Sequence, residues 1–442
     1  MKKIHWITLF SFFLLCLLFI FTLSRGDTFV NYGFSYAIRL GEVPYKDFNM
    51  VITPLAPFLY SIGLFIYNDL LTIYIEQALL LTVLFYILYQ LLGKKSILLL
   101  LLFIIPYPIA MVSTIFPGYN FLLYFLLISF IYIYKHRYNY YLYGILLGLI
   151  FCTKQTVGIV LLIPTLYYLF TDRKSFFKIL IGYMLPCLFL FLYLIITNSL
   201  SEFINLCFLG LFDFQKSNQH IDWFYFILLL IGIGYFIYRI IHDKKNLLLY
   251  YGLLFSIISI PIIDYYHVSL FYLVVLYFLV DSIQISKKYY SIIYVFIPFI
   301  CILWSFVSYY YMKNPVIDSM NHFHYILVSK DYKKYSKELM TKVSDKKVIY
   351  LMRGSENYYY KILHNQRIDY FDLPNYGNYG YHGVDKMIGK IQDLHDYYFV
   401  LDRVLMKDNS LFQQYIKELG NTVIQNSVLV DSVGVYDIYY KE

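Results

Sequence analysis

The chain has 442 residues, of which 60% are hydrophobic and 14% are charged, and its formal net charge is +8. A soluble chain of this size usually carries about 25% charged residues, so an ordinary soluble protein is excluded. The Lys and Arg residues gather in short clusters at the ends of apolar runs, which indicates membrane topology and argues against nucleic-acid binding. The five cysteines have no CxxC spacing, so neither a disulfide framework nor a zinc site is indicated.

The first apolar run covers residues 6–23 and follows two lysines. A basic start also suits a signal peptide, but this run is long and has no small-residue cleavage pattern, so we expect a retained first helix. The later runs also lie near the length of a membrane span, and together they predict about eleven spans. These later runs are 70–92, 96–112, 119–134, 140–153, 156–170, 176–197, 223–240, 247–263, 268–284 and 289–311.

One further apolar run, residues 54–67, has only about fourteen residues, which suits a re-entrant or interfacial segment better than a span. If this run does not cross, the basic clusters between spans all fall on the side of the N-terminus, which is then the cytoplasm. If it crosses, every later cluster moves to the opposite side. The charges therefore predict a multi-pass protein of the plasma (inner) membrane, with a cytoplasmic N-terminus and residues 24–69, here called the first loop, outside the cytoplasm.

After about residue 312 the sequence becomes polar and alternates helical and strand patterns, which predicts a small extracytoplasmic α/β domain of about 130 residues. We therefore divide the chain into a membrane domain, residues 1–311, and a C-terminal domain, residues 312–442. A hairpin is expected around Ser432–Gly434, and the last helix is expected to end at Gly420. Within this domain we expect helices over 330–343, 355–365, 384–394 and 409–420, and strands over 346–352 and 396–403.

The first loop contains several residues that can carry chemistry. Asp27 lies close to the exit of the first helix, where a carboxylate can act as general base on an acceptor hydroxyl, although a solvated loop acid is the simpler alternative. Arg39 follows a short amphipathic helix expected over 29–40 and suits either a phosphate or lipid headgroups. Asp47 follows the turn GEVPY and can bind a cation or a sugar hydroxyl, or pair with a neighbouring basic residue.

Further candidates lie in or near turns expected on the same side of the membrane. Lys154, in FCTKQTVG, places an ammonium near membrane depth, which indicates function, although snorkelling to headgroups is the alternative. His267 can bind a phosphate or help to hold a metal with Asp264, or can serve only as a hydrogen-bonding residue. Glu76, in an apolar run, is expected to face a cavity. Acids and cations on one side suit inverting glycosyl transfer, which needs a base for the acceptor and cations for the departing phosphate.

Two motifs resemble a known family. The pattern RGD-x(4)-YG-x(3)-AIRLGEVPYKDF followed by TPLAPFLYSIG resembles the first extracytoplasmic loop of GT-C membrane glycosyltransferases, and GLIFCTKQTVG resembles a turn of the same family. The similarity is closest to the bacterial branch of the protein O-mannosyltransferase and aminoarabinose transferase superfamily. It implies a GT-C-like polytopic helical fold, Asp27 as catalytic base and Lys154 near the donor phosphate. Thr28 stands where many members carry a second acid, so metal dependence is left open, with Asp47 as the candidate second acid.

The resemblance implies transfer of a hexosyl or pentosyl group, with inversion, from a polyprenyl-phosphate donor to an extracytoplasmic glycan, lipid or protein. Undecaprenyl phosphate is the expected carrier, decoration of cell-envelope polysaccharide the expected setting, and a divalent cation a candidate cofactor. The alternatives are a polysaccharide polymerase and a flippase or transporter of envelope glycans. Transporters place polar residues near the membrane midplane and often show inverted repeats. This chain concentrates its polar residues on one side and shows no such repeat, which favours the transferase.

Overall fold

The computed structural model describes residues 13–14, 27–96, 118–213, 221–260, 262–282, 316–317, 325–326, 330–364, 366–372, 378–407 and 414–442. The chain divides into two compact units, and each is described here by itself. The helical unit comprises Met1–Thr28, Thr53–Phe191 and His220–Pro315. The sheet unit comprises Phe29–Ile52, Leu192–Gln219 and Val316–Glu442. Much of the first loop therefore belongs to the same compact unit as the C-terminal residues.

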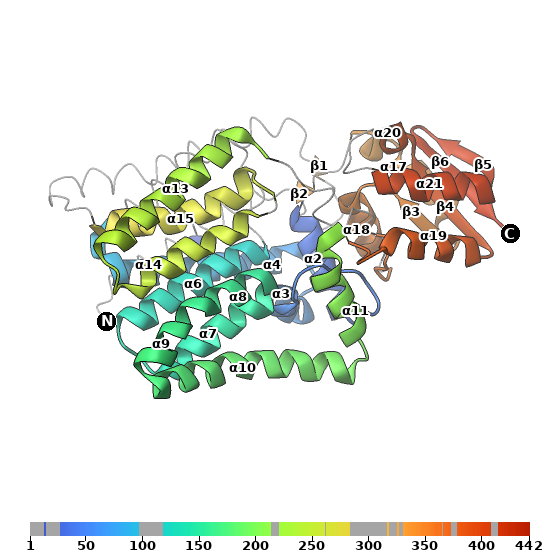
Figure 1. Ribbon diagram of the computed structural model, residues 1–442. Helices are drawn as coiled ribbons and strands as arrows, with labels where there is room; N and C mark the ends of the chain where they lie inside the picture. The colour runs from blue at the N-terminus through green and yellow to red at the C-terminus, as the bar shows by residue number, and fades with distance from the viewer. Residues whose placement is uncertain are drawn as a thin grey trace. The chain divides into compact units, whose positions relative to one another are not determined.

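The described part of the helical unit consists mainly of apolar helices (Figure 1). Asp69, Asn139 and Asp222 each accept a backbone N–H in the first turn of the helix that follows, which satisfies a donor left free at a helix start. The helices are α3 (Leu55–Ile66), α4 (Leu70–Leu92), α6 (Tyr119–Lys135), α7 (Tyr140–Thr153), α8 (Gln155–Leu162), α9 (Leu166–Thr171), α10 (Arg173–Ile196, whose end enters the sheet unit), α13 (Trp223–His242), α14 (Leu247–Leu254) and α15 (Tyr265–Ser282). Short 3₁₀ turns are η1 (Gly93–Lys95), η2 (Ile163–Thr165) and η4 (Phe255–Ser259).

Three of the described helices, α4, α10 and α13, are long and apolar enough to cross a membrane, and six further apolar helices have 10–17 residues. The prediction of about eleven spans is therefore not confirmed. The expected spans 156–170 and 247–263 are interrupted by η2 and η4, and Pro164 in η2 cannot donate a helical hydrogen bond. The expected spans 6–23, 96–112 and 289–311 lie almost wholly outside the described residues. The run 54–67 forms the 12-residue helix α3.

Helices α7 and α10 approach each other closely because two glycines on α7 lie four residues apart. A Cβ atom at Gly144 would lie 2.6 Å from the backbone nitrogen of Tyr183, and one at Gly148 would lie 2.5 Å from Cγ of Pro186. Small residues at this spacing let helix backbones come together where lipid provides no hydrophobic driving force. The pair fixes α7, and with it the turn that follows at Lys154.

The sheet unit contains a four-stranded sheet in the order β3-β4-β6-β5, in which β3 and β4 are parallel and the other pairs are antiparallel. Its strands are β3 (Val348–Leu351), β4 (Tyr397–Asp402), β5 (Val428–Val433) and β6 (Tyr436–Lys441), and a separate pair is β1 (Val316–Ile317) and β2 (Tyr325–Ile326). Its helices are α2 (Asp27–Arg39, which begins in the helical unit), α11 (Leu200–Ile204), α17 (Lys330–Val343), α18 (Gly354–Leu363), α19 (Gly383–Asp393), α20 (Arg403–Lys407) and α21 (Gln414–Asn426), and η3 (Asn205–Leu209) is a π-helical turn.

The core of this sheet lies between the strands and two helices that pack beside each other, α19 and α21 (Figure 1). The predicted helix 330–343 is confirmed as α17, and the hairpin turn at Gly434 is confirmed with a positive φ of 58°. The predicted helix end at Gly420 is wrong, because α21 continues to Asn426. This glycine provides room for a neighbour instead: a Cβ atom there would lie 2.6 Å from Cε of Met406.

Candidate functional site

In the helical unit, Lys154 occupies the turn between α7 and α8 and belongs to the backbone hydrogen bonding of both. Its N–H donates to the carbonyl of Ile150 at 2.9 Å, and its own carbonyl accepts from Gly158 at 3.1 Å. Its half-buried side chain places Nζ 5.8 Å from the ring centroid of Tyr119, the first residue of α6, which is within the range of a cation–π interaction. The turn thus holds a cation against an aromatic ring at the meeting of three helices.

Asp264 precedes α15 and acts as its N-cap. Its Oδ1 accepts the backbone N–H of His267 at 3.0 Å and lies 2.8 Å from Nδ1 of the same residue. Burial disfavours the ammonium form of Lys154, and the charge of Asp264 lies close enough to oppose this effect in part. The structure therefore brings together three of the predicted site residues, from two turns more than a hundred residues apart in sequence.

Glu76 lies in the second turn of α4 and faces α3. Its Oε1 accepts the backbone N–H of Gly63 at 2.9 Å, while its Oε2 is buried without a hydrogen-bond partner among the described residues. The phenol of Tyr60 lies near this carboxylate and near the carboxamide of Gln77. Glu76 therefore links two helices, and its role toward a substrate or cation stays a prediction.

Helix α2 begins at Asp27, in the helical unit, and ends at Arg39 in the sheet unit, where a tight turn follows. The exposed Asp47 closes this turn, because its Oδ2 accepts the backbone N–H of Val43 at 2.7 Å. Tyr45 adopts a φ of 71° and is fully buried, with its hydroxyl donating to the carbonyl of Ile52 at 2.7 Å. The motif GEVPYKDF is thus a rigid turn that presents Asp47 outward. The catalytic and binding roles of Asp27, Arg39 and Asp47 remain predictions.

The residue of the first loop that sequence reasoning missed is Glu42. Its side chain is 5% exposed, whereas Asp47 in the same turn is exposed. The only signal in the sequence is its place between Gly41 and Val43, just before a proline, in a loop rich in apolar residues.

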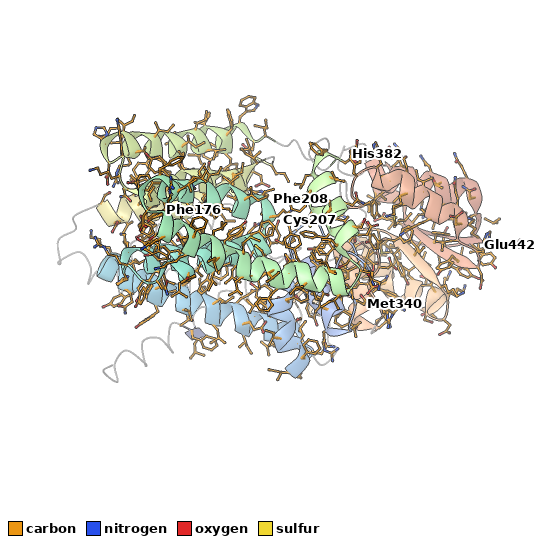
Figure 2. All side chains as sticks on the ribbon, turned by 60° about the horizontal axis from the view of Figure 1, so that its bottom comes forward. Phe176, Cys207, Phe208, Met340, His382 and Glu442 are labelled. Carbon is orange, nitrogen blue, oxygen red and sulfur yellow. The ribbon has the colours of Figure 1, made fainter. Side chains whose placement is uncertain are left out.

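A later segment of the sheet unit holds the C-terminal residues through side-chain acceptors. Asn205, on η3, accepts the backbone N–H of Tyr381 at 3.0 Å, and Asp213 accepts that of His382 at 2.8 Å. His382, labelled in Figure 2 together with Cys207 of η3, has a φ of 50° and precedes α19. The two acceptors satisfy backbone donors at a helix start that has no cap of its own among its neighbours in sequence.

The described residues contain no group of three or more His, Cys, Asp or Glu side chains that could hold a metal ion. His267 and Asp264 supply two such groups, and Asp47 is already engaged with its own turn. The described side chains therefore form no site with three such ligands, and a divalent cation stays a prediction.

Comparison with family models and with curated proteins gives no match. Among solved structures, the crystal structure of the Archaeoglobus fulgidus oligosaccharyltransferase in its apo form is 10% identical, with a TM-score of 0.48 over 91% of this chain and 70% of that chain. The Archaeoglobus fulgidus oligosaccharyltransferase AglB in complex with an inhibitory peptide and a dolichol-phosphate is 9% identical, with a TM-score of 0.47 over 100% and 75%. At this level of similarity neither structure assigns a role to any residue of this chain.

Proposed function

We propose that this protein is a membrane glycosyltransferase that moves a sugar from a polyprenyl-phosphate donor to an acceptor outside the cytoplasm. The donor carries a phosphate at the end of a long apolar chain, so its site must offer a cation beside apolar helices. The first loop supplies Asp27 as the proposed base, and Lys154, Arg39 and His267 are the proposed phosphate-binding residues. Asp47, Glu76 and Asp264 are proposed to contact the substrate or a cation.

The observation that carries this proposal is the setting of Lys154. A lysine held half-buried at the junction of α7 and α8, 5.8 Å from the ring of Tyr119, is costly unless its charge is used. The charge of Asp264 offsets part of the burial that disfavours the ammonium, and the histidine beside Asp264 offers a further hydrogen bond. A single cation with donors around it suits one phosphate monoanion better than a polyanion such as nucleic acid.

The test is transfer of labelled sugar from a panel of undecaprenyl-phosphate sugars in membranes that contain equal amounts of wild type or variant. We expect Lys154→Met to lower kcat at least about 100-fold, because removal of one group that stabilises developing charge typically costs that much. Lys154→Arg keeps the charge and should retain part of the activity. Lys178→Met, at an exposed position of α10, is the matched control and should transfer at the wild-type rate.

Asp27→Asn addresses the proposed base and should also lower transfer at least about 100-fold. If Asp27→Asn transfers normally, the base lies elsewhere, with Asp47 the next residue to substitute. Addition of a chelator to the same assay decides metal dependence. If the wild type transfers from no donor in the panel, the glycosyltransferase proposal fails and lipid-linked glycan export becomes the assay to run.

A further inference from the structure

Glu42 lies where the first loop packs against residues of the C-terminal region, within the sheet unit. Its backbone N–H donates to the carbonyl of Ala37 at 3.0 Å, which seats it directly after α2. On the same side of α2, the ring of Phe34 meets that of Tyr358 on α18 in an edge arrangement at 6.0 Å. The backbone of α2 at Gly33 also lies against this tyrosine, because a Cβ atom there would lie 2.8 Å from Cγ of Tyr358. The first loop is therefore docked on α18 at the point where Glu42 is buried.

The carboxyl group of Glu42 is buried without a counter-ion of its own among the described residues. Both of its oxygens are buried without a hydrogen-bond partner among the described residues, and the amide of Ile368 faces it without the geometry of a hydrogen bond. Lys361 is close enough to act on it but is already shared by two other carboxylates, at 2.6 Å from Asp372 and 2.9 Å from Asp369. A charged Glu42 would therefore be a third carboxylate around one buried lysine, which is an expensive arrangement.

The remaining groups around Glu42 do not remove this cost. From α2 comes the phenol of Tyr36, and from α18 the phenol of Tyr358; neither carries a compensating positive charge. Arg367, in the segment 366–372, is exposed and acts on Glu42 only through its charge. The negative charge of Asp47, in the same loop as Glu42, opposes this effect of Arg367. Burial raises the pKa of Glu42 to about 8, and the charge of Asp47 adds to the increase. The Ile368 amide, Lys361 and Arg367 lower this pKa but do not cancel the effect of burial.

We propose that residues 29–52 of the first loop stay packed on α18 only while Glu42 is an uncharged carboxylic acid, so that ionisation of Glu42 releases this part of the loop. Arg39 and Asp47 flank Glu42 in this loop, and their placement depends on it. The docking itself is independent of the proposed function, and only its consequence for transfer rests on that proposal.

The direction of the pH dependence follows from the two protonation states. The docked loop binds the proton more tightly than the released loop, in which the carboxyl group has its ordinary pKa of about 4.5. Docking is therefore strongest below pH 4.5 and weakens as the pH rises toward 8. In this range the equilibrium constant for opening rises by up to about tenfold per pH unit. Above pH 8 the loss levels off.

The test is hydrogen exchange in the purified full-length protein, measured by mass spectrometry on peptides that cover residues 40–52, for wild type and Glu42→Gln from pH 6 to pH 9. Comparison at each pH cancels the intrinsic pH dependence of exchange. We expect the exchange rate of wild type divided by that of Glu42→Gln to rise at least about tenfold between pH 6 and pH 9. Peptides from α17 should exchange alike in both proteins. Equal exchange of residues 40–52 in the two proteins at every pH would overturn the proposal.

Arg367→Gln provides an independent variant at an exposed position, in case Glu42→Gln does not fold. Because Arg367 lowers the pKa of Glu42 in the docked loop, its removal should raise the pH at which the loss of protection levels off, and a fall in that pH contradicts the proposal. The transfer assay over the same pH range should show that Glu42→Gln keeps its activity on the alkaline side better than wild type. If no protein transfers sugar at all, the proposed function fails, while the exchange data still decide the role of Glu42.

Discussion

The carboxylate of Glu76 on α4 accepts the backbone N–H of Gly63 on α3, with 2.9 Å between Oε1 and the amide nitrogen. The contact exists because Gly63 has no side chain. A Cβ atom there would lie 2.5 Å from Oε1 of Glu76 and closer still to the methyl group of Thr72. A short helix that does not reach spanning length is in this way attached to one that does.

Gly63→Ala should therefore separate α3 from α4 and lower the free energy of unfolding by about 1–3 kcal/mol, as overpacking at a close contact does. The measurement is thermal unfolding of the purified protein in detergent. Gly234→Ala is the matched control, because a Cβ atom at this position of α13 meets nothing within 4 Å. It should be neutral or stabilising by up to about 1 kcal/mol, since alanine favours a helix over glycine.

The buried ion pair of Lys361 with Asp372 predicts that removing one partner lowers the free energy of unfolding more than removing both. These side chains are 5% and 1% exposed, with 2.6 Å between Nζ and Oδ2. Lys361→Met leaves a buried carboxylate without its partner and should cost about 3–5 kcal/mol in unfolding experiments. Adding Asp372→Asn should recover part of this loss. Lys342→Met breaks the exposed pair with Asp431 and should cost less than about 1 kcal/mol. Equal losses at the two lysines would contradict the buried pairing.

Asn205 and Asp213 accept backbone N–H groups just before α19, so loss of one acceptor should loosen the start of this helix. Asp213→Ala removes the partner of the His382 N–H and should weaken this attachment by about 1.5–3 kcal/mol, the usual value for a hydrogen bond to a charged group. Hydrogen exchange should then accelerate in peptides that cover residues 381–386 and remain unchanged in β4. Lys386→Ala, which breaks only the exposed pair with Glu202, should change exchange there far less. No acceleration in Asp213→Ala would show that this bond does not form in solution.

Local patterns in the sequence predicted the structure correctly where it depends on residues that are close together in the chain. The amphipathic pattern of 330–343 predicts α17, the glycine at 434 allows the positive φ of the hairpin turn, and the shortness of 54–67 anticipates α3. Polar residues at Lys154, Asp264 and His267 were also visible as interruptions of apolar runs. Their convergence was an expectation from topology, and the structure places Asp264 beside His267 and close enough for its charge to act on Lys154.

Pairings between distant segments could not be obtained in this way. Gly420 looks like a helix end in sequence, and only the approach of Met406 explains why the helix continues past it. Glu42 looks like any acid in a turn, and its burial depends on α18 and residues 366–372, more than three hundred positions away. The sequence by itself determined the apolar helices, the C-terminal α/β pattern and the candidate residues, because these depend on periodicity and local backbone preference. The tertiary structure alone decided which carboxylates are buried and which cation they share, because burial and charge pairing depend on contacts between segments far apart in the chain.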